Sequence, residues 1–233
     1  MTERPVPGTT PPPVPELDDE PRRRGPALLL VRHGETTSNV RGALDTALPG
    51  APLTALGREQ AAALGRELRA EGLAPERLLS SEALRARETA ALVGAELGTD
   101  AHAVSGVYEV QAGDLEMRDD AAAIGSYDAL LHAWLARGEY AEALPGGETA
   151  EDVRARITPV LDELGAVVRS GGDCVLVVHG TLLRLAAVFL GAVPPAWALV
   201  NRIPNCGVVE LAPTAGGGWE CARWGHARGP LTF

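Results

Sequence analysis

Two short runs of purely apolar residues stand out along the chain, at residues 27–31 and 174–178. Runs of this kind are typical of strands that are covered on both faces by other elements. Between and after them, segments with apolar residues at helical spacing alternate with further short strand-like segments. This alternation predicts an α/β fold with a layered architecture.

The helical segments are set by their apolar spacing. A helix is predicted to start at Thr54 and to carry Leu56, Ala63, Leu64 and Leu68 on one side. Further helices are expected at 82–97, 121–136, 149–168 and 181–190. In the second of these, Leu130, Leu131 and Trp134 recur at helical spacing and are expected in the core.

The remaining strands are short. A strand is expected at 77–79, and segments 207–211 and 220–224 read as a closing pair joined by the glycine turn at 216–218. Residues 1–25 are different in composition, with seven prolines and the triplet Arg22-Arg23-Arg24. This segment has too little apolar content to offset the entropy of folding, so a disordered tail is predicted, followed by one domain over 26–233.

Charge and composition exclude several classes of function. The formal net charge is −10, which disfavours a broad nucleic-acid-binding surface. All 21 basic residues are arginine, so neither a Schiff-base lysine nor a P-loop lysine is available. Any phosphate or carboxylate ligand must therefore be bound by arginine, histidine and backbone N–H groups.

Cysteine usage and hydropathy indicate the compartment. Cys174, Cys206 and Cys221 form no CxxC pair, which favours buried free thiols over a disulfide framework or a zinc site. The N-terminus has no apolar run of signal-peptide type, and no apolar stretch is long enough to span a membrane. The cytoplasm is the expected location, with no membrane partner.

Candidate chemistry follows three of the predicted strands. The first buried strand ends in Arg32-His33-Gly34 and the second in His179-Gly180, while the strand near residue 79 leads to Arg85. In open α/β sheets, ligands bind outside the carboxyl ends of the strands. If the three strands are parallel neighbours, two histidines and two arginines meet in one place.

That combination suits phosphoryl transfer. Two guanidinium groups can neutralise a phosphate dianion, a neutral imidazole can attack phosphorus, and a second imidazole can donate to an equatorial oxygen. Gly34 and Gly180 would let the backbone approach the ligand closely. His102, His132 and His226 lack this context, and no HxH, HxxxH or HExxH spacing occurs, so neither a metal nor another cofactor is expected.

Several motifs in one order resemble the histidine phosphatase superfamily, which is also called phosphoglycerate-mutase-like. The similarity covers nearly all of the chain after the tail. It rests on LVRHGET at 30–36 with Asn39 beyond it, LTALGREQA at 53–61, SSEALRARETA at 80–90, GGET at 146–149 and VHG at 178–180.

The resemblance implies a role for each matching residue. His33 would be the nucleophile that becomes phosphohistidine. Arg32, Arg85 and His179 would complete the phosphate pocket, with Asn39 on the same oxygens. The implied fold is a three-layer α/β/α sandwich around a mostly parallel sheet, with residues 107–145 forming part of a cap over the pocket.

The same resemblance implies that Glu109 donates a proton to the leaving alcohol. Its segment departs from the family pattern, because Leu115 stands in place of a tryptophan and Met117 in place of a glycine. Four other carboxylates compete for this role, and each also has a structural interpretation as a surface or capping residue: Glu35, Asp114, Glu116 and Glu148.

Three functions are compatible with these observations. The first is a phosphomonoesterase whose binding partner is its substrate, a small phosphorylated metabolite. A homodimer would also be consistent with the sequence. The second is a 2,3-bisphosphoglycerate-dependent phosphoglycerate mutase. The third is an inactive binding module, which is disfavoured because every matched catalytic position is filled. Residues 117–144 contain no proline and no adjacent arginine pair, which favours the phosphatase.

Overall fold

The computed structural model describes residues 25–225, 227, 228 and 231 of the 233-residue chain. His226 and the predicted tail at 1–25, apart from Gly25, therefore lie outside the described residues. The described part is built on one seven-stranded mixed sheet with the order β3-β2-β4-β1-β5-β6-β7. Its strands are β1 Leu28–Arg32, β2 Pro75–Ser81, β3 His102–Val104, β4 Asp173–Val178, β5 Val208–Pro213, β6 Trp219–Gly225 and β7 Ala227–Arg228.

Strand direction divides the sheet in two. Strands β3, β2, β4 and β1 pair in parallel, whereas β5, β6 and β7 extend the sheet antiparallel beyond β1. The antiparallel part contains the predicted closing pair, joined through the glycine turn. The expected parallel adjacency of the first buried strand, the second, and the strand near residue 79 is confirmed.

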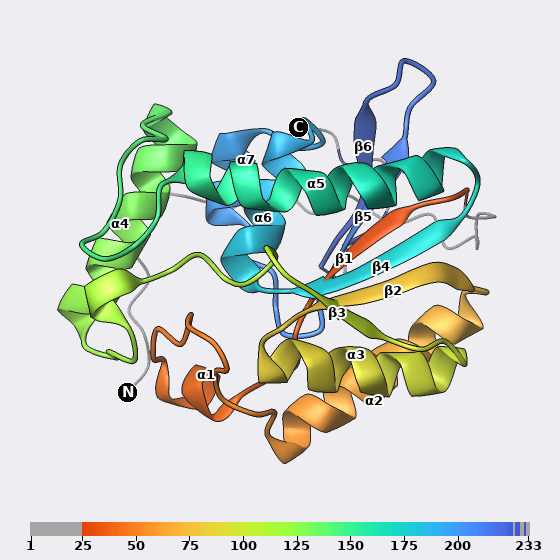
Figure 1. Ribbon diagram of the computed structural model, residues 1–233, viewed down its shortest axis with the longest axis horizontal. Helices are drawn as coiled ribbons and strands as arrows, with labels where there is room; N and C mark the ends of the chain where they lie inside the picture. The colour runs from red at the N-terminus through yellow and green to blue at the C-terminus, as the bar shows by residue number, and fades with distance from the viewer. Residues whose placement is uncertain (1–24, 226, 229–230, 232–233) are drawn as a thin grey trace.

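Helices cover both faces of the sheet, as the three-layer prediction requires (Figure 1). One face carries α2 and α3, and the other carries α5, α6 and α7, with α4 packed against α7. The helices are α1 Thr37–Arg41, α2 Ala55–Ala70, α3 Leu84–Leu97, α4 Ala121–Arg137, α5 Ala150–Arg169, α6 Gly180–Phe189 and α7 Pro195–Val200, with a 3₁₀ turn, η1, at Gly113–Leu115.

Alternation along β1 explains why its sequence is wholly apolar. Leu28 and Leu30 are fully buried against the layer of α4–α7, while Leu29 and Val31 are fully buried against α2 and α3. Successive side chains of a strand point to opposite faces, so a strand with a helical layer on each side needs apolar residues at every position.

One predicted helix face is wrong in part. Leu64 and Leu68 of α2 are buried as expected, but Leu56 is 49% exposed and Ala63 is exposed. The buried stripe follows the 3.6-residue period through Gly57, and two of its members are glycines that admit neighbouring backbone or side chains. The prediction counted Leu56 and Ala63 and left out the glycines, so it placed part of the stripe incorrectly.

The cysteine prediction is confirmed, since Cys174, Cys206 and Cys221 are buried free thiols. Burial raises the pKa of Cys206 to about 12, so it remains a thiol. Within residues 25–225, 227, 228 and 231, no helix combines the length and apolar character that crossing a bilayer requires.

Candidate active site

The parallel register brings the predicted residues to one edge of the sheet. Arg32 pairs with Val178 at the end of β1 and β4, and the next backbone N–H, that of His33, donates to the carbonyl of Val178 at 3.0 Å. His179 follows β4 directly, and Ser81 ends β2 on its other side. The rings of His33 and His179 lie 5.3 Å apart between centroids.

Hydrogen bonding fixes which nitrogen of His33 is free. Its Nδ1 lies 2.8 Å from the carbonyl of Gly34, and a carbonyl can only accept, so Nδ1 carries the proton. Nε2 then keeps its lone pair. Burial, Arg85 and Arg32 together hold the pKa of His33 well below its usual range, so the ring stays neutral and nucleophilic.

His179 is fully buried and is held on both sides of its ring. The Nε of Arg85, which can only donate, lies 3.2 Å from Nδ1, so the proton of the neutral ring is on Nε2 and faces Ser81 Oγ at 2.9 Å. Burial and the neighbouring arginine lower the pKa of His179 strongly. A serine hydroxyl can donate or accept, so Ser81 can also satisfy the other tautomer. In that tautomer Nδ1 would donate to a bound anion, which requires that the Nε–H of Arg85 no longer face Nδ1.

Two arginines bring donors that the protein does not use. The Nη1 of Arg32 donates to the carbonyl of Ile203 at 2.7 Å, but its buried Nε has no hydrogen-bond partner. The buried Nη1 of Arg85 likewise has none, although Asp45 Oδ1 lies 3.6 Å away. Burial lowers the pKa of Arg85 below its usual value, and the charges of Asp45 and Glu109 offset only part of that shift. Since buried donors in proteins are normally paired, these two mark a site for an anion.

The glycines beside the histidines are required by close packing. A Cβ on Gly34 would collide with the backbone of Gly57 at the start of α2, and its N–H donates to Thr89 Oγ1 on α3 at 3.0 Å. A Cβ on Gly180 would lie 3.2 Å from the Nε of Arg32, the same nitrogen that is without a partner. Gly180 thus keeps that donor accessible.

Asn39 is oriented by a residue that the sequence did not single out. Its Oδ1 accepts from the backbone N–H of Thr36 at 3.1 Å and from Nδ2 of Asn205 at 3.1 Å. Asn205 Nδ2 also donates to the carbonyl of His33 at 3.0 Å. With Oδ1 fixed by two donors, the amide group of Asn39 has its Nδ2 donor left over for a ligand.

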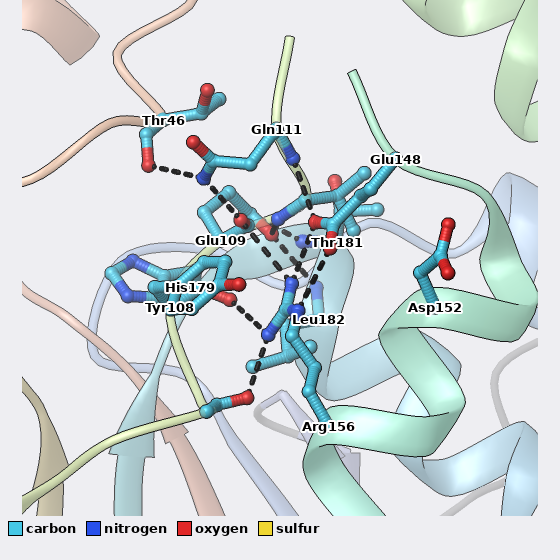
Figure 2. Close-up of polar contacts among 12 residues, drawn as sticks. Thr46, Tyr108, Glu109, Gln111, Glu148, Asp152, Arg156, His179, Thr181 and Leu182 are labelled. Carbon is cyan, nitrogen blue, oxygen red and sulfur yellow. Dashed lines mark hydrogen bonds and ion pairs between the residues drawn. The ribbon is translucent and has the colours of Figure 1, made fainter. Parts of the chain in front are cut away.

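Glu109 lies at the start of α6, immediately beyond His179. Its Oε1 accepts from the backbone N–H groups of Leu182 and of Val110, and its Oε2 accepts from Thr181 at 3.0 Å (Figure 2). Burial lowers the pKa of both Arg32 and Arg85, and the charge of Glu109 opposes that shift, so Glu109 lies within electrostatic reach of both arginines. Oε2 accepts a single bond, so it has a lone pair left to carry a proton.

Three of the four competing carboxylates have other partners. Glu35 accepts from Thr54 Oγ1, Glu116 accepts from the backbone and hydroxyl of Thr46, and Glu148 forms an ion pair with Arg156. Each of these three therefore has the structural role that was the alternative interpretation.

Met117 takes a left-handed backbone with φ of 61°, the conformation that glycine adopts most easily.

Sequence reasoning missed three residues at the site. Asp45 faces Arg85 from a loop, Ser81 contacts His179, and Asn205 reaches the backbone of His33 from 172 positions away. Ser81 stands in a motif that was recognised, so its place at the end of β2 was a usable signal. The other two lie in irregular segments, where no periodicity predicts the direction of a side chain.

Among the residues that the structure describes, no three His, Cys, Asp or Glu side chains are grouped so as to hold a metal ion. The positive charge at the site comes from Arg32 and Arg85. Two neutral imidazoles, two guanidinium groups with free donors and a carboxyl group meet at this site. Such a set can bind a phosphoryl group, accept it on nitrogen and protonate a leaving group.

The chain matches a known family. The sequence profile of the Histidine phosphatase superfamily (branch 1) matches residues 28–227, which is most of the chain. The chain belongs to this superfamily, and the resemblance seen in its motifs is confirmed.

Individual relatives divide between two activities. The chain is 34% identical over 182 residues to a 2,3-bisphosphoglycerate-dependent phosphoglycerate mutase of Bradyrhizobium sp. (strain ORS 278), covering 76% of this chain and 86% of the mutase. The structure of a mycobacterial glucosyl-3-phosphoglycerate phosphatase superposes with a TM-score of 0.72 at 28% identity, covering 87% of this chain and 100% of that one. An alpha-ribazole phosphatase from Shigella flexneri superposes with a TM-score of 0.69 at 25% identity, covering 89% and 100%.

Proposed function

We propose that this protein is a phosphomonoesterase that hydrolyses a small phosphorylated metabolite through a phosphohistidine at His33. The observation that carries the proposal is the pair of unpartnered buried donors on Arg32 and Arg85, next to a neutral His33 whose Nε2 lone pair is free. A phosphoryl group bound by those donors would have its phosphorus facing a nucleophile. The solved phosphatases with the same fold support this assignment.

The proposed reaction has two steps, phosphorylation of His33 and hydrolysis of the phosphohistidine. In the first, His33 Nε2 forms a bond to phosphorus, the bond from phosphorus to the ester oxygen breaks, and Glu109 gives its proton to the leaving alkoxide. In the second, a water attacks phosphorus and gives a proton to Glu109, and the phosphorus–nitrogen bond breaks. Arg32, Arg85 and His179 stabilise the equatorial oxygens in both steps, so the scheme needs no divalent metal.

Glu109→Gln is expected to slow alkyl phosphates by about 10²-fold or more while slowing p-nitrophenyl phosphate only slightly. A poor leaving group needs a proton, whereas p-nitrophenolate leaves without one. The measurement is kcat/KM on both substrates for the wild type and the variant.

The comparison variant for Glu109→Gln is Asp45→Asn, because Asp45 is a carboxylate whose Oδ1 lies 3.6 Å from Nη1 of Arg85. If Asp45→Asn shows the leaving-group dependence and Glu109→Gln does not, the proton donor has been assigned to the wrong residue. An equal loss on both substrates in Glu109→Gln would assign that residue a structural role at the start of α6.

Phosphoglycerate mutase is the second candidate, and it is favoured by the curated relatives that are 32–34% identical. A mutase must hold a phosphorylated three-carbon acid while it reorients and must keep water away from the phosphohistidine. Free cationic groups over the pocket would serve the first need.

The arginines of the predicted cap are occupied by their own neighbours. Arg118 pairs with Asp120 through two hydrogen bonds of 2.8 and 2.9 Å, and Arg137 pairs with Glu139. Two aspartates of this region are paired as well, Asp128 with Arg202 and Asp119 with Arg41. Because these aspartates are paired, they would repel a phosphoglycerate carboxylate only weakly. The pairing of both cap arginines therefore carries the preference for hydrolysis.

Phosphate release should exceed the interconversion of 2- and 3-phosphoglycerate by orders of magnitude, and bisphosphoglycerate should not stimulate the enzyme. The assay follows released phosphate from a panel of monoesters, including glucosyl-3-phosphoglycerate and α-ribazole phosphate, alongside the mutase reaction. All reactions contain a chelator, because the proposed mechanism uses no metal. Efficient interconversion with negligible phosphate release would identify a mutase instead.

A further inference from the structure

The guanidinium group of Arg156 binds the backbone of residues 106–109, the segment that carries Glu109. Arg156, on the second turn of α5, donates through Nη1 to the carbonyls of Gly106 at 2.7 Å and Tyr108 at 2.9 Å, and through Nη2 to that of Glu109 at 3.4 Å. Its guanidinium carbon lies 3.9 Å from the centre of the Tyr108 ring. Three carbonyls of one irregular segment are thus fixed by one rigid planar group.

Glu148 fixes Arg156 in turn. Its two oxygens accept from Nε at 2.8 Å and from Nη2 at 2.7 Å, and both side chains are only 12% exposed. Its Oε1 also accepts from the backbone N–H of Gln111 at 2.9 Å. Figure 2 shows the pair between α5 and the segment that carries Glu109. The bidentate ion pair therefore restrains the segment on both sides of Glu109.

The start of α5 explains how these two residues meet. Thr149 is the N-cap, and a capping box with Asp152 sets the first turn of the helix. Glu148 precedes the cap, and Arg156 follows two turns along, on the side that faces residues 106–111. The position of the ion pair thus follows from where the helix begins.

Arg156 has no donor left for a substrate. A guanidinium group has five N–H donors, and the five acceptors are the two oxygens of Glu148 and the three carbonyls of residues 106, 108 and 109. Arg32 and Arg85 differ in this respect, because each has a donor without a partner. Arg156 therefore acts on the site only through the segment that it holds.

On its other side, Glu109 is bound at the start of α6 by the N–H groups of Thr181 and Leu182. The carboxyl group is thus held between α5, through its backbone, and α6, through its oxygens. Tyr127 of α4 also contacts this segment, donating to the carbonyl of Val110 at 3.1 Å. A displacement of the backbone at residues 106–109 would shift the carboxyl group relative to the leaving group.

We propose that Arg156, locked by Glu148, is a positioning residue that places Glu109 for proton transfer to the leaving group. The inference rests on the proposed phosphatase mechanism. Misplacement of a catalytic group by about 1 Å can reduce a rate by roughly 10²-fold. Loss of the Arg156 guanidinium group should therefore selectively impair proton transfer from Glu109 to the leaving group.

The test compares Arg156→Lys with Glu109→Gln. Lysine retains the charge of arginine but has three donors on a flexible stem, so it cannot fix the same five acceptors. Arg156→Lys is expected to lose about 10- to 100-fold in kcat on an alkyl phosphate and less than about threefold on p-nitrophenyl phosphate. The dissociation constant for vanadate should not change, because Arg156 does not contact the anion.

Two further variants and one control complete the experiment. Glu148→Gln should show the same substrate selectivity with a smaller loss of kcat. The guanidinium group of Arg156 is retained in this variant but loses its charged partner. Combining Arg156→Lys with Glu109→Gln should add little on the alkyl phosphate, because both changes remove the same proton transfer. Arg154→Lys, an exposed residue two positions away on α5, is the matched control and should behave as the wild type.

The outcomes separate the two proposals. If Glu109→Gln is selective against alkyl phosphates but Arg156→Lys and Glu148→Gln slow both substrates equally, the ion pair is merely structural and the inference fails alone. Unchanged kinetics in both Arg156→Lys and Glu148→Gln would also overturn it. If the wild type releases no phosphate, or if Glu109→Gln shows no selectivity, the proposed mechanism itself fails.

Discussion

Replacing His33 with alanine is expected to reduce kcat by roughly 10⁴- to 10⁶-fold while leaving the protein folded, because the phosphoryl group loses the atom that receives it. The remaining donors on Arg32 and Arg85 can still bind the anion. The dissociation constant for inorganic phosphate should therefore change far less than kcat. Steady-state kinetics and calorimetric titration with phosphate measure the two quantities.

His102→Ala is the matched control for the His33 variant, because it removes an exposed histidine from β3, away from the central strand ends. Circular dichroism and thermal melting of the His33→Ala variant check that the fold is retained. Retention of more than about a tenth of wild-type kcat in a folded His33→Ala protein would mean that another residue is the nucleophile, since removal of a nucleophile costs several orders of magnitude.

Arg85→Lys is expected to reduce kcat/KM by about 10²- to 10³-fold. Arg85 donates to His179 through Nε while its Nη1 is unpartnered, so it both orients an imidazole and offers a donor to the phosphoryl oxygens. Lysine provides one point charge and cannot do both at once. Lysine is preferred to alanine here, because alanine would leave Asp45 buried without its cation.

Arg87→Lys is the control for this variant, since Arg87 is an exposed residue on the same helix. Binding of vanadate should weaken in Arg85→Lys and remain unchanged in Arg87→Lys. If Arg85→Lys had wild-type kcat/KM and vanadate affinity, Arg85 would not be part of the phosphate pocket, and the assignment of its unpartnered donor would be wrong.

The buried strands and their ends could be predicted because their sequence is dominated by one constraint. Residues 28–31 and 174–178 need apolar side chains on both faces, so they are recognisable without knowledge of the fold, and the polar residues that follow them stand out. Parallel neighbours then bring those ends together by geometry alone. Arg32, His33 and His179 were therefore found from the pattern of the sequence.

Short elements and long-range contacts could not be predicted in this way. Helices α1 and α7 have five and six residues, too few to show a helical period, and β3 has three. The contact between Asn205 and His33 depends on where the loop after α7 meets the end of β1, which tertiary packing decides. Arg156 was invisible for the same reason, since its partners lie 8 to 50 positions away.

The assignment of the proton donor shows where a family resemblance helps most. Glu109 lies in an irregular segment, and nothing in its local sequence distinguishes it from Glu116, which likewise accepts backbone N–H groups. The motif singled it out, and the structure then placed its carboxyl group on the N–H groups of Thr181 and Leu182, at the start of the helix that follows His179. The chemistry of a carboxylate at a helix start does not by itself separate a capping residue from an acid.

The most direct test of the mechanism is to trap the intermediate. Wild-type protein is mixed with a phosphorus-labelled monoester, quenched within the first turnover, and digested for mass spectrometry under alkaline conditions. The mechanism predicts acid-labile, base-stable phosphate on His33, absent from the His33→Ala variant and accumulating in proportion to active sites. Label on a serine or an aspartate, or rapid hydrolysis with no labelled protein at any quench time, would contradict it.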